Sequence, residues 1–284
     1  MITDMRLRSS SPIKKVFIVF VQLIMACYVL AILYPLFNMI ISSFKSTRDI
    51  IRTPLALPKE INIKNYVDVW VNKNFGKYFF NSLLLTSIAM FFVVLLGSMA
   101  GFGLSRYRFK GNTLLYMLFL SGIMLPLKAA VIPLFMIIKT LNLMNHPLSV
   151  LLVFIAMGIP STVFILSGFM RTIPHELEQA ARIDGCSDLR IYSQIIMPIC
   201  MPSIALVTIY NAVPIWNDFF FPLVFLRSDA YKTLPLGLSS FIGQHSTKWE
   251  LLFTGLCIAI IPMIILYLFM SKYFIKGMTS GAIK

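Results

Sequence analysis

Charged residues are scarce in this chain. Asp, Glu, Lys and Arg together make up 13% of its 284 residues, against about 25% in a typical soluble domain. Cysteines and histidines are also few, with no Cys-x-x-Cys pair and with the histidines in separate segments. We therefore expect neither a disulfide framework nor a metal site. The residues concerned are Cys27, Cys186, Cys200, Cys257, His146, His175 and His245.

Sequence signatures of catalysis are absent as well. There is no Gly-x-x-x-x-Gly-Lys-Ser/Thr segment, so nothing in the chain can cradle the phosphates of ATP. Gly101-Phe102-Gly103 is a lone glycine pair, which close helix packing explains better than phosphate binding. No His-Glu-x-x-His occurs, and no catalytic pair is evident among the apolar segments. We predict that the chain is not an enzyme and that it binds no cofactor itself.

Apolar residues fill most of the chain. They make up 58% of it, and several runs reach or exceed the ~20 residues that a helix needs to cross a bilayer. We predict an all-α membrane protein with one membrane domain at 16–273, an N-terminus at 1–15 and a tail at 274–284. The first run is too long for a signal peptide and should be an uncleaved span. The six predicted spans are 16–43, 78–104, 113–141, 149–169, 199–226 and 251–273.

Positive charge dominates the polar residues. The formal net charge is +14, but Lys and Arg divide almost evenly between the two predicted sides of the membrane. Short loops near the spans carry most weight in the positive-inside rule. Lys14, Lys15 and the basic residues at 106–110 therefore favour the cytoplasm, against the long outer loop at 44–77. Because the charge is spread over both faces, we do not expect a nucleic-acid partner.

A polar, helix-forming segment at 176–198 interrupts the apolar pattern. Ala180 and Ala181 keep one side of this helix thin, so that a partner surface can approach closely. Gly185 should end the helix in the left-handed conformation, and Pro198 closes or kinks the helix that follows. We expect a short, stiff helix between two spans, shaped to sit in another protein's groove. The alternative is an ordinary capped connection.

This segment resembles the EAA loop of the membrane-spanning subunits of binding-protein-dependent ABC importers. The family pattern is Glu-Ala-Ala, three residues, Gly, nine residues and Ile-x-Leu-Pro; here Gln179 replaces Glu and Met197 replaces Leu. The resemblance implies a type I permease core whose loop, at about 171–198, docks on a cytoplasmic ATPase, with both termini in the cytoplasm. The residues it implies in ATPase coupling are Glu178, Gln179, Ala180, Ala181, Asp184, Gly185, Ile195 and Pro198.

The resemblance covers nearly the whole chain and is closest to the carbohydrate-importing, maltose-type subclass. Residues 105–111, Ser-Arg-Tyr-Arg-Phe-Lys-Gly, are similar to the basic loop after its second span. The resemblance implies that the tail reaches the ATPase interface and that an outer loop at 227–249 enters the cleft of an extracellular binding protein. By composition alone, these segments are typical of a disordered terminus and a surface turn. The residues implied are Gly277, Gly281 and Lys284 in the tail, and Leu234, Pro235 and Gly237 in the loop.

Polar residues within the fifth apolar run are candidates for the substrate pathway, because burying them in a membrane is costly without a function. Aromatic rings stack on the C–H faces of sugars, and amides and carboxylates bridge sugar hydroxyls. An aromatic belt at the outer membrane interface is equally consistent. Lys128, in the third run, is expected to snorkel outward, with a place in the pathway as the lesser alternative. The candidates are Asn211, Trp216, Asn217, Asp218 and Phe219.

Six spans with one EAA-like loop make half of a translocation pathway in the cell membrane. The resemblance implies a second, homologous permease subunit, two ATPase subunits that bind ATP and Mg, and an extracellular binding protein that delivers a sugar. An ion-gradient-driven secondary transporter is the alternative, although that class usually carries paired acidic residues near the midplane, and Asp218 stands alone. An importer of a non-sugar solute is the other alternative.

Overall fold

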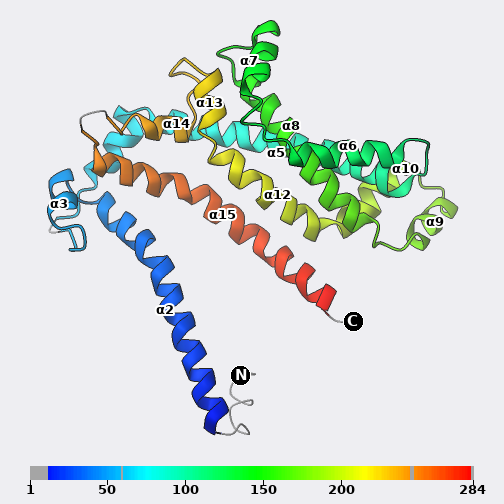
Figure 1. The fold of residues 1–284 in the computed structure, drawn as a ribbon, viewed down its shortest axis with the longest axis horizontal. Coiled ribbons are helices and arrows are strands. Elements are labelled where there is room, and N and C mark those ends of the chain that lie inside the picture. The colour runs from blue at the N-terminus through cyan, green and yellow to red at the C-terminus, as the bar shows by residue number, and fades with distance from the viewer. Residues whose placement is uncertain (1–11, 59, 244–245, 283–284) are drawn as a thin grey trace. The chain divides into compact units, whose positions relative to one another are not determined.

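The structure is a computed structural model that describes residues 12–58, 60–243 and 246–282, and the side chains between 16 and 273. Within these residues it is predominantly helical, with one isolated bridge between Ile242 and Thr247, which confirms the all-α part of the predicted fold class (Figure 1). The helices are α2 (Pro12–Ser43), α3 (Thr47–Arg52), α4 (Lys64–Val67), η1 (Asp68–Asn72), α5 (Phe75–Arg106), α6 (Asn112–Met124), α7 (Val131–Thr140), α8 (Pro147–Met170), α9 (Glu176–Ile183), α10 (Asp188–Arg190), η2 (Ile191–Ile196), α11 (Met197–Ile199), α12 (Met201–Trp216), α13 (Phe220–Phe225), α14 (Leu234–Ser239) and α15 (Trp249–Ala282).

The predicted count of six spans is not confirmed. Among the described residues, four helical segments are long and apolar enough to cross a membrane: Val16–Ser43, Phe75–Arg106, Pro147–Met170 and Trp249–Tyr273. A fifth is present if Asp188–Ile199 and Met201–Trp216, which meet at a bend of 77°, count as one span.

The predicted span at 113–141 is divided into α6 and α7, each shorter than a membrane-crossing helix. The division falls where Leu125, with ψ of 126°, precedes Pro126. A residue before proline is pushed out of the helical region, and proline itself cannot donate the next helical hydrogen bond. The predicted span at 199–226 is likewise shorter than expected, since α12 ends at Trp216 and α13 is a separate helix.

The chain divides into two compact units, one formed by residues up to Val69 with 241–258, the other by 70–240 with 259–284. In the first unit, the carbonyl of Ser43 accepts hydrogen bonds from Asn65 Nδ2 (2.9 Å) and Thr254 Oγ1 (3.1 Å). The ammonium of Lys45, 2% exposed, donates to the carbonyls of Thr53 and Pro54. These bonds fix the start of the predicted outer loop at 44–77.

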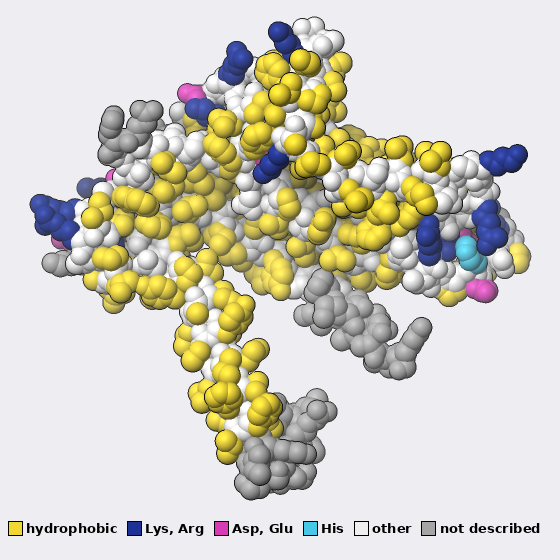
Figure 2. Space-filling view, in the orientation of Figure 1, with side chains coloured by type: hydrophobic (Ala, Val, Ile, Leu, Met, Phe, Trp, Pro, Cys, Tyr) yellow, Lys and Arg dark blue, Asp and Glu magenta, His cyan; other side chains and the backbone are white. Residues whose placement is uncertain are grey.

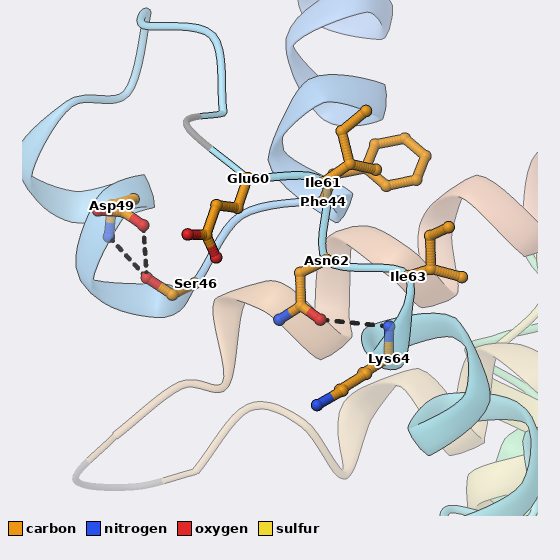
Figure 3. Close-up of a pocket in the computed structure, with 8 residues that line it drawn as sticks. All are labelled: Phe44, Ser46, Asp49, Glu60, Ile61, Asn62, Ile63 and Lys64. Atoms are coloured by element: carbon orange, nitrogen blue, oxygen red, sulfur yellow. Dashed lines mark hydrogen bonds between the residues drawn. The ribbon is translucent and has the colours of Figure 1, made fainter.

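The same unit contains a cavity of about 680 Å³ in this loop (Figure 3). Ser46 caps α3 there by accepting a bond from the backbone N–H of Asp49, and its hydroxyl donates to the Asp49 carboxylate (2.8 Å). No residue in the most apolar 18-residue window of α2 is buried, and most of its apolar side chains are exposed (Figure 2). A helix of this kind needs lipid or another protein around it.

The core of the second unit is the packing of α5 on α8. Small residues let the two backbones approach: a Cβ on Gly158 would meet the Val93 side chain at 2.6 Å, and one on Gly97 would meet Thr162. Close approach through small residues is the usual way in which membrane helices associate. α12 packs against both of these helices, and this arrangement positions the predicted coupling loop at about 171–198 and the cavities described below.

Candidate functional site

The predicted coupling loop contains a short helix, as expected. α9 runs from Glu176 to Ile183, and Gly185 follows with φ of +77°. Such a φ is easily adopted by glycine and rarely by other residues, so the prediction that Gly185 ends the helix in the left-handed conformation is confirmed. The connection then runs through α10, η2 and α11 to α12, with Pro198 exposed and Ile195 half-buried.

The residues of α9 divide between an inner and an outer side. Glu178 and Ala181 are each 6% exposed, and Ala181 packs in a cluster with Phe102 of α5 and Leu166 of α8. Gln179, Ala180 and Asp184 are exposed. The prediction that both alanines keep the partner-facing side thin is therefore corrected: Ala181 is small because it fits against the chain's own helices, and Ala180 alone lies at the surface.

A buried ion pair holds α9 to the end of α5. Arg106 Nε lies 2.6 Å from Glu178 Oε1, and the two side chains are 2% and 8% exposed. Arg106 Nη2 also donates to the carbonyl of Ile173, just before the helix (3.1 Å). A second pair, Arg182 with Asp188 at 2.6 Å, is half-exposed. The sequence placed Arg106 and Glu178 in separate motifs, and no spacing rule indicated that they meet.

Two cavities adjoin the predicted substrate residues, and both are lined by Lys128, Met157, Pro214 and Ile215. The larger, about 540 Å³, also reaches Asn211. The smaller, about 360 Å³, is lined in addition by Asn217, Asp218, Phe219 and Phe220.

The ammonium of Lys128 lies 5.9 Å from the centre of the Phe220 ring. Lys128 lines both cavities; the sequence favoured an outward-snorkelling side chain, with a place in the pathway as the lesser alternative.

The five predicted pathway residues do not all line one cavity. Trp216 is 2% exposed, and its indole N–H donates to the carbonyl of Ala259 (3.0 Å), so it is a core residue. Asn211 Oδ1 accepts a bond from Ser161 Oγ, which joins α8 and α12, and Asn211 Nδ2 donates within α12 to the carbonyl of Val207. Asn217, Asp218 and Phe219 remain at the cavity wall.

The predicted binding-protein loop forms a short helix, α14, and is packed down on α5. Ser82 Oγ accepts from the backbone N–H of Leu234 (2.8 Å). Leu234 and Gly237 are buried, and only Pro235 of the three predicted residues is half-exposed. In the tail, α15 continues through Ala282, so Gly277 and Gly281 lie in a helix, whereas Lys284 lies outside the described residues. Within the described part of the chain, no group of three or more metal-binding side chains is present.

Residues 93–280, more than half of the chain, match the family described as binding-protein-dependent transport system inner membrane component. The chain belongs to this family. It is 36% identical over 257 residues to the probable ABC transporter permease protein YurM of Bacillus subtilis (strain 168), covering 90% of this chain and 85% of the relative. It is 35% identical over 256 residues to the arabinooligosaccharides transport system permease protein AraQ of the same organism, covering 89% and 90%.

Among solved structures, the permease fold is similar to that of a bacterial ABC transporter involved in the import of the acidic polysaccharide alginate. The TM-score is 0.81 at 23% identity, over 93% of this chain and 99% of that chain. The resemblance to ABC importer permeases is therefore confirmed, and with it the prediction that the chain is a transport component and not an enzyme.

Proposed function

We propose that this permease forms half of the pathway of an ATP-driven importer for a sugar or oligosaccharide. The observation that carries the proposal is α9: a short helix anchored by buried residues on one side, with an exposed side that includes Ala180 and Ile183, the latter 87% exposed. A short helix that is held on its inner side and free on its outer side is suited to dock in the groove of a partner protein.

The proposed assembly has a second, homologous permease subunit, two cytoplasmic ATPase subunits that bind ATP and Mg, and an extracellular binding protein. It implies six spans in the cell membrane, with both termini in the cytoplasm. ATP binding would close the ATPase pair and shift the pathway between inward- and outward-facing states. Of the coupling residues, Gln179, Ala180 and Asp184 are exposed and suited to the ATPase contact. Family membership argues against a secondary transporter driven by an ion gradient.

Support for a carbohydrate substrate comes from relatives and from the cavities. Besides AraQ, a melibiose/raffinose/stachyose import permease protein, MelC of Bacillus subtilis (strain 168), is 31% identical over 265 residues, with 93% of this chain and 96% of the relative covered. The smaller cavity combines an amide, a carboxylate, an ammonium and aromatic rings, which are the groups that bind sugar hydroxyls and C–H faces. An uptake screen of sugars and other solutes tests this assignment, and uptake of a non-sugar solute alone would contradict it.

The coupling proposal is tested at Ala180. Ala180→Trp places a large ring on the exposed side of α9, where the chain's own packing is not disturbed. We expect the ATPase subunits to be largely lost from membranes that still contain the variant permease, measured by immunoblot of washed membranes. Gln179→Glu, which restores the usual family residue, should retain them. Normal ATPase retention by Ala180→Trp would show that α9 is not the docking element.

The pathway proposal is tested by thiol labelling at Asn217. In an importer whose native cysteines are replaced, Asn217→Cys should react with a membrane-impermeant thiol reagent at a rate that changes when Mg-ATP is added. Leu223→Cys, on the exposed side of α13, is the control and should not change. Labelling of Asn217→Cys that is independent of nucleotide would favour the aromatic-belt interpretation.

A further inference from the structure

We propose that the ion pair of Arg106 and Glu178 is the positioning element that carries the movement of α9 into α5. This inference rests on the proposed function, because it assigns these residues a role behind the ATPase-contacting surface. It also gives a role to the basic motif at 105–111, which the docking proposal leaves unused. Neither residue would touch the ATPase; both act through the position of α9.

The first observation is the burial of the pair. Both side chains are at least nine-tenths buried, and their charged atoms lie 2.6 Å apart. Removing two charges from water is costly, and here the cost is only partly offset, because Arg106 Nε and Nη1 and Glu178 Oε1 make no well-aligned hydrogen bond. The pair is therefore better suited to fixing the position of α9 than to adding stability. An exposed pair would hold the two segments together weakly, since surface ion pairs contribute little. The buried position of Glu178 is also incompatible with direct contact to a partner.

The second observation is that Arg106 holds α9 at more than one point. Its Nε pairs with Glu178 in the first turn, while its Nη2 donates to Ile173 in the segment that leads into the helix. One turn further along, Ala181 packs in the same cluster as Phe102 of α5. The last turn of α5 and the inner side of α9 are thus joined by an ion pair, a hydrogen bond and apolar packing.

The third observation is the packing of α5 on the helices that line the cavities. α5 packs closely on α8 through Gly97 and Gly158, and it also packs on α12. Interfaces of this density shift as rigid bodies rather than deforming smoothly. A displacement of α9 would therefore be passed through Arg106 to α5, and from α5 to α8 and α12, whose residues line both cavities.

The test uses the whole importer in liposomes, with its partner permease, ATPase and binding protein. The wild-type complex is measured first: if it does not retain the ATPase, the proposed function fails before the ion pair is tested. The variants are Glu178→Gln, Arg106→Gln, and the double variant in which both charges are removed. Glu176→Gln, a change of an exposed glutamate in the same turn, is the matched control. Each variant is scored for ATPase retention, thermal-unfolding midpoint, and the ratio of ATP hydrolysis with and without the binding protein.

We expect Glu178→Gln to retain the ATPase while the hydrolysis ratio falls to near unity, and Glu176→Gln to keep the wild-type ratio. The double variant separates positioning from stability, because it leaves no buried charge unpaired. Its unfolding midpoint should return toward the wild-type value while the hydrolysis ratio stays near unity. Recovery of the ratio together with the midpoint would show a purely structural pair. Loss of the ATPase comparable to that of Ala180→Trp would place Glu178 in the docking surface. Either result overturns the proposal.

Discussion

Replacing Trp216 with alanine should destabilise the permease by about 3–5 kcal/mol, the usual cost of removing a large buried aromatic side chain. The indole is 2% exposed, its N–H donates to Ala259, and its ring meets that of Phe79 at 5.9 Å between centres. We expect a lower thermal-unfolding midpoint and a lower yield of intact protein, measured by fluorescence-detected size-exclusion chromatography. Transport should fall because less folded protein is present.

Trp216→Phe is the matched control for this prediction. It keeps an aromatic ring in the core and removes the hydrogen bond, at a cost of about 1 kcal/mol. A normal unfolding midpoint for Trp216→Ala, combined with lost uptake, would contradict this interpretation and return Trp216 to the substrate pathway that the sequence predicted.

Gly158→Leu should separate α5 from α8 and prevent a stable fold. Even a Cβ at this position would lie 2.6 and 2.8 Å from the two methyl carbons of Val93, well inside van der Waals contact. Overpacking of this kind costs about 1–3 kcal/mol and sometimes more, and here two backbones must move apart. The expected result is a large loss of monodisperse protein in detergent, scored by the same chromatography.

Gly168→Leu provides the comparison within the same helix. A Cβ on Gly168 has no neighbour within 4 Å, so the side chain projects into open space and helix propensity improves. If both leucine variants were equally stable, close approach at Gly158 would not be what holds α5 and α8 together.

The sequence was sufficient where a single local property decides the structure. Four of the six predicted spans correspond to long helices, and Gly185 has the positive φ that its place after a helix predicted. The break at Leu125–Pro126 also has a local cause, the proline, but the apolar run continues through it and does not reveal the break. The prediction of one span at 199–226 failed for a similar reason, because a continuous apolar run does not indicate where a helix ends.

The candidate site was less predictable because it depends on which side of each element is buried. Ala180 and Ala181 are identical, adjacent residues, yet tertiary packing buries only Ala181. The pairing of Arg106 with Glu178 joins two motifs that are far apart in the sequence, and no local rule reports such a contact. Trp216 is chemically suited to bind a sugar, and only its burial shows that it packs inside the chain.

A 77° bend at Cys200 lets the predicted coupling loop convert a displacement into a rotation. Asp188–Ile199 forms a rod on the order of 15 Å long at helical rise, and it meets α12 at nearly a right angle. The ion pair between Arg182 and Asp188 attaches the end of α9 to the far end of this rod. A tilt of about 10° around Cys200 would move that far end by about 3 Å for a rod of this length. If α9 docks on an ATPase as proposed, this segment would act as a lever arm that exchanges a displacement at its tip for a rotation at the base of α12.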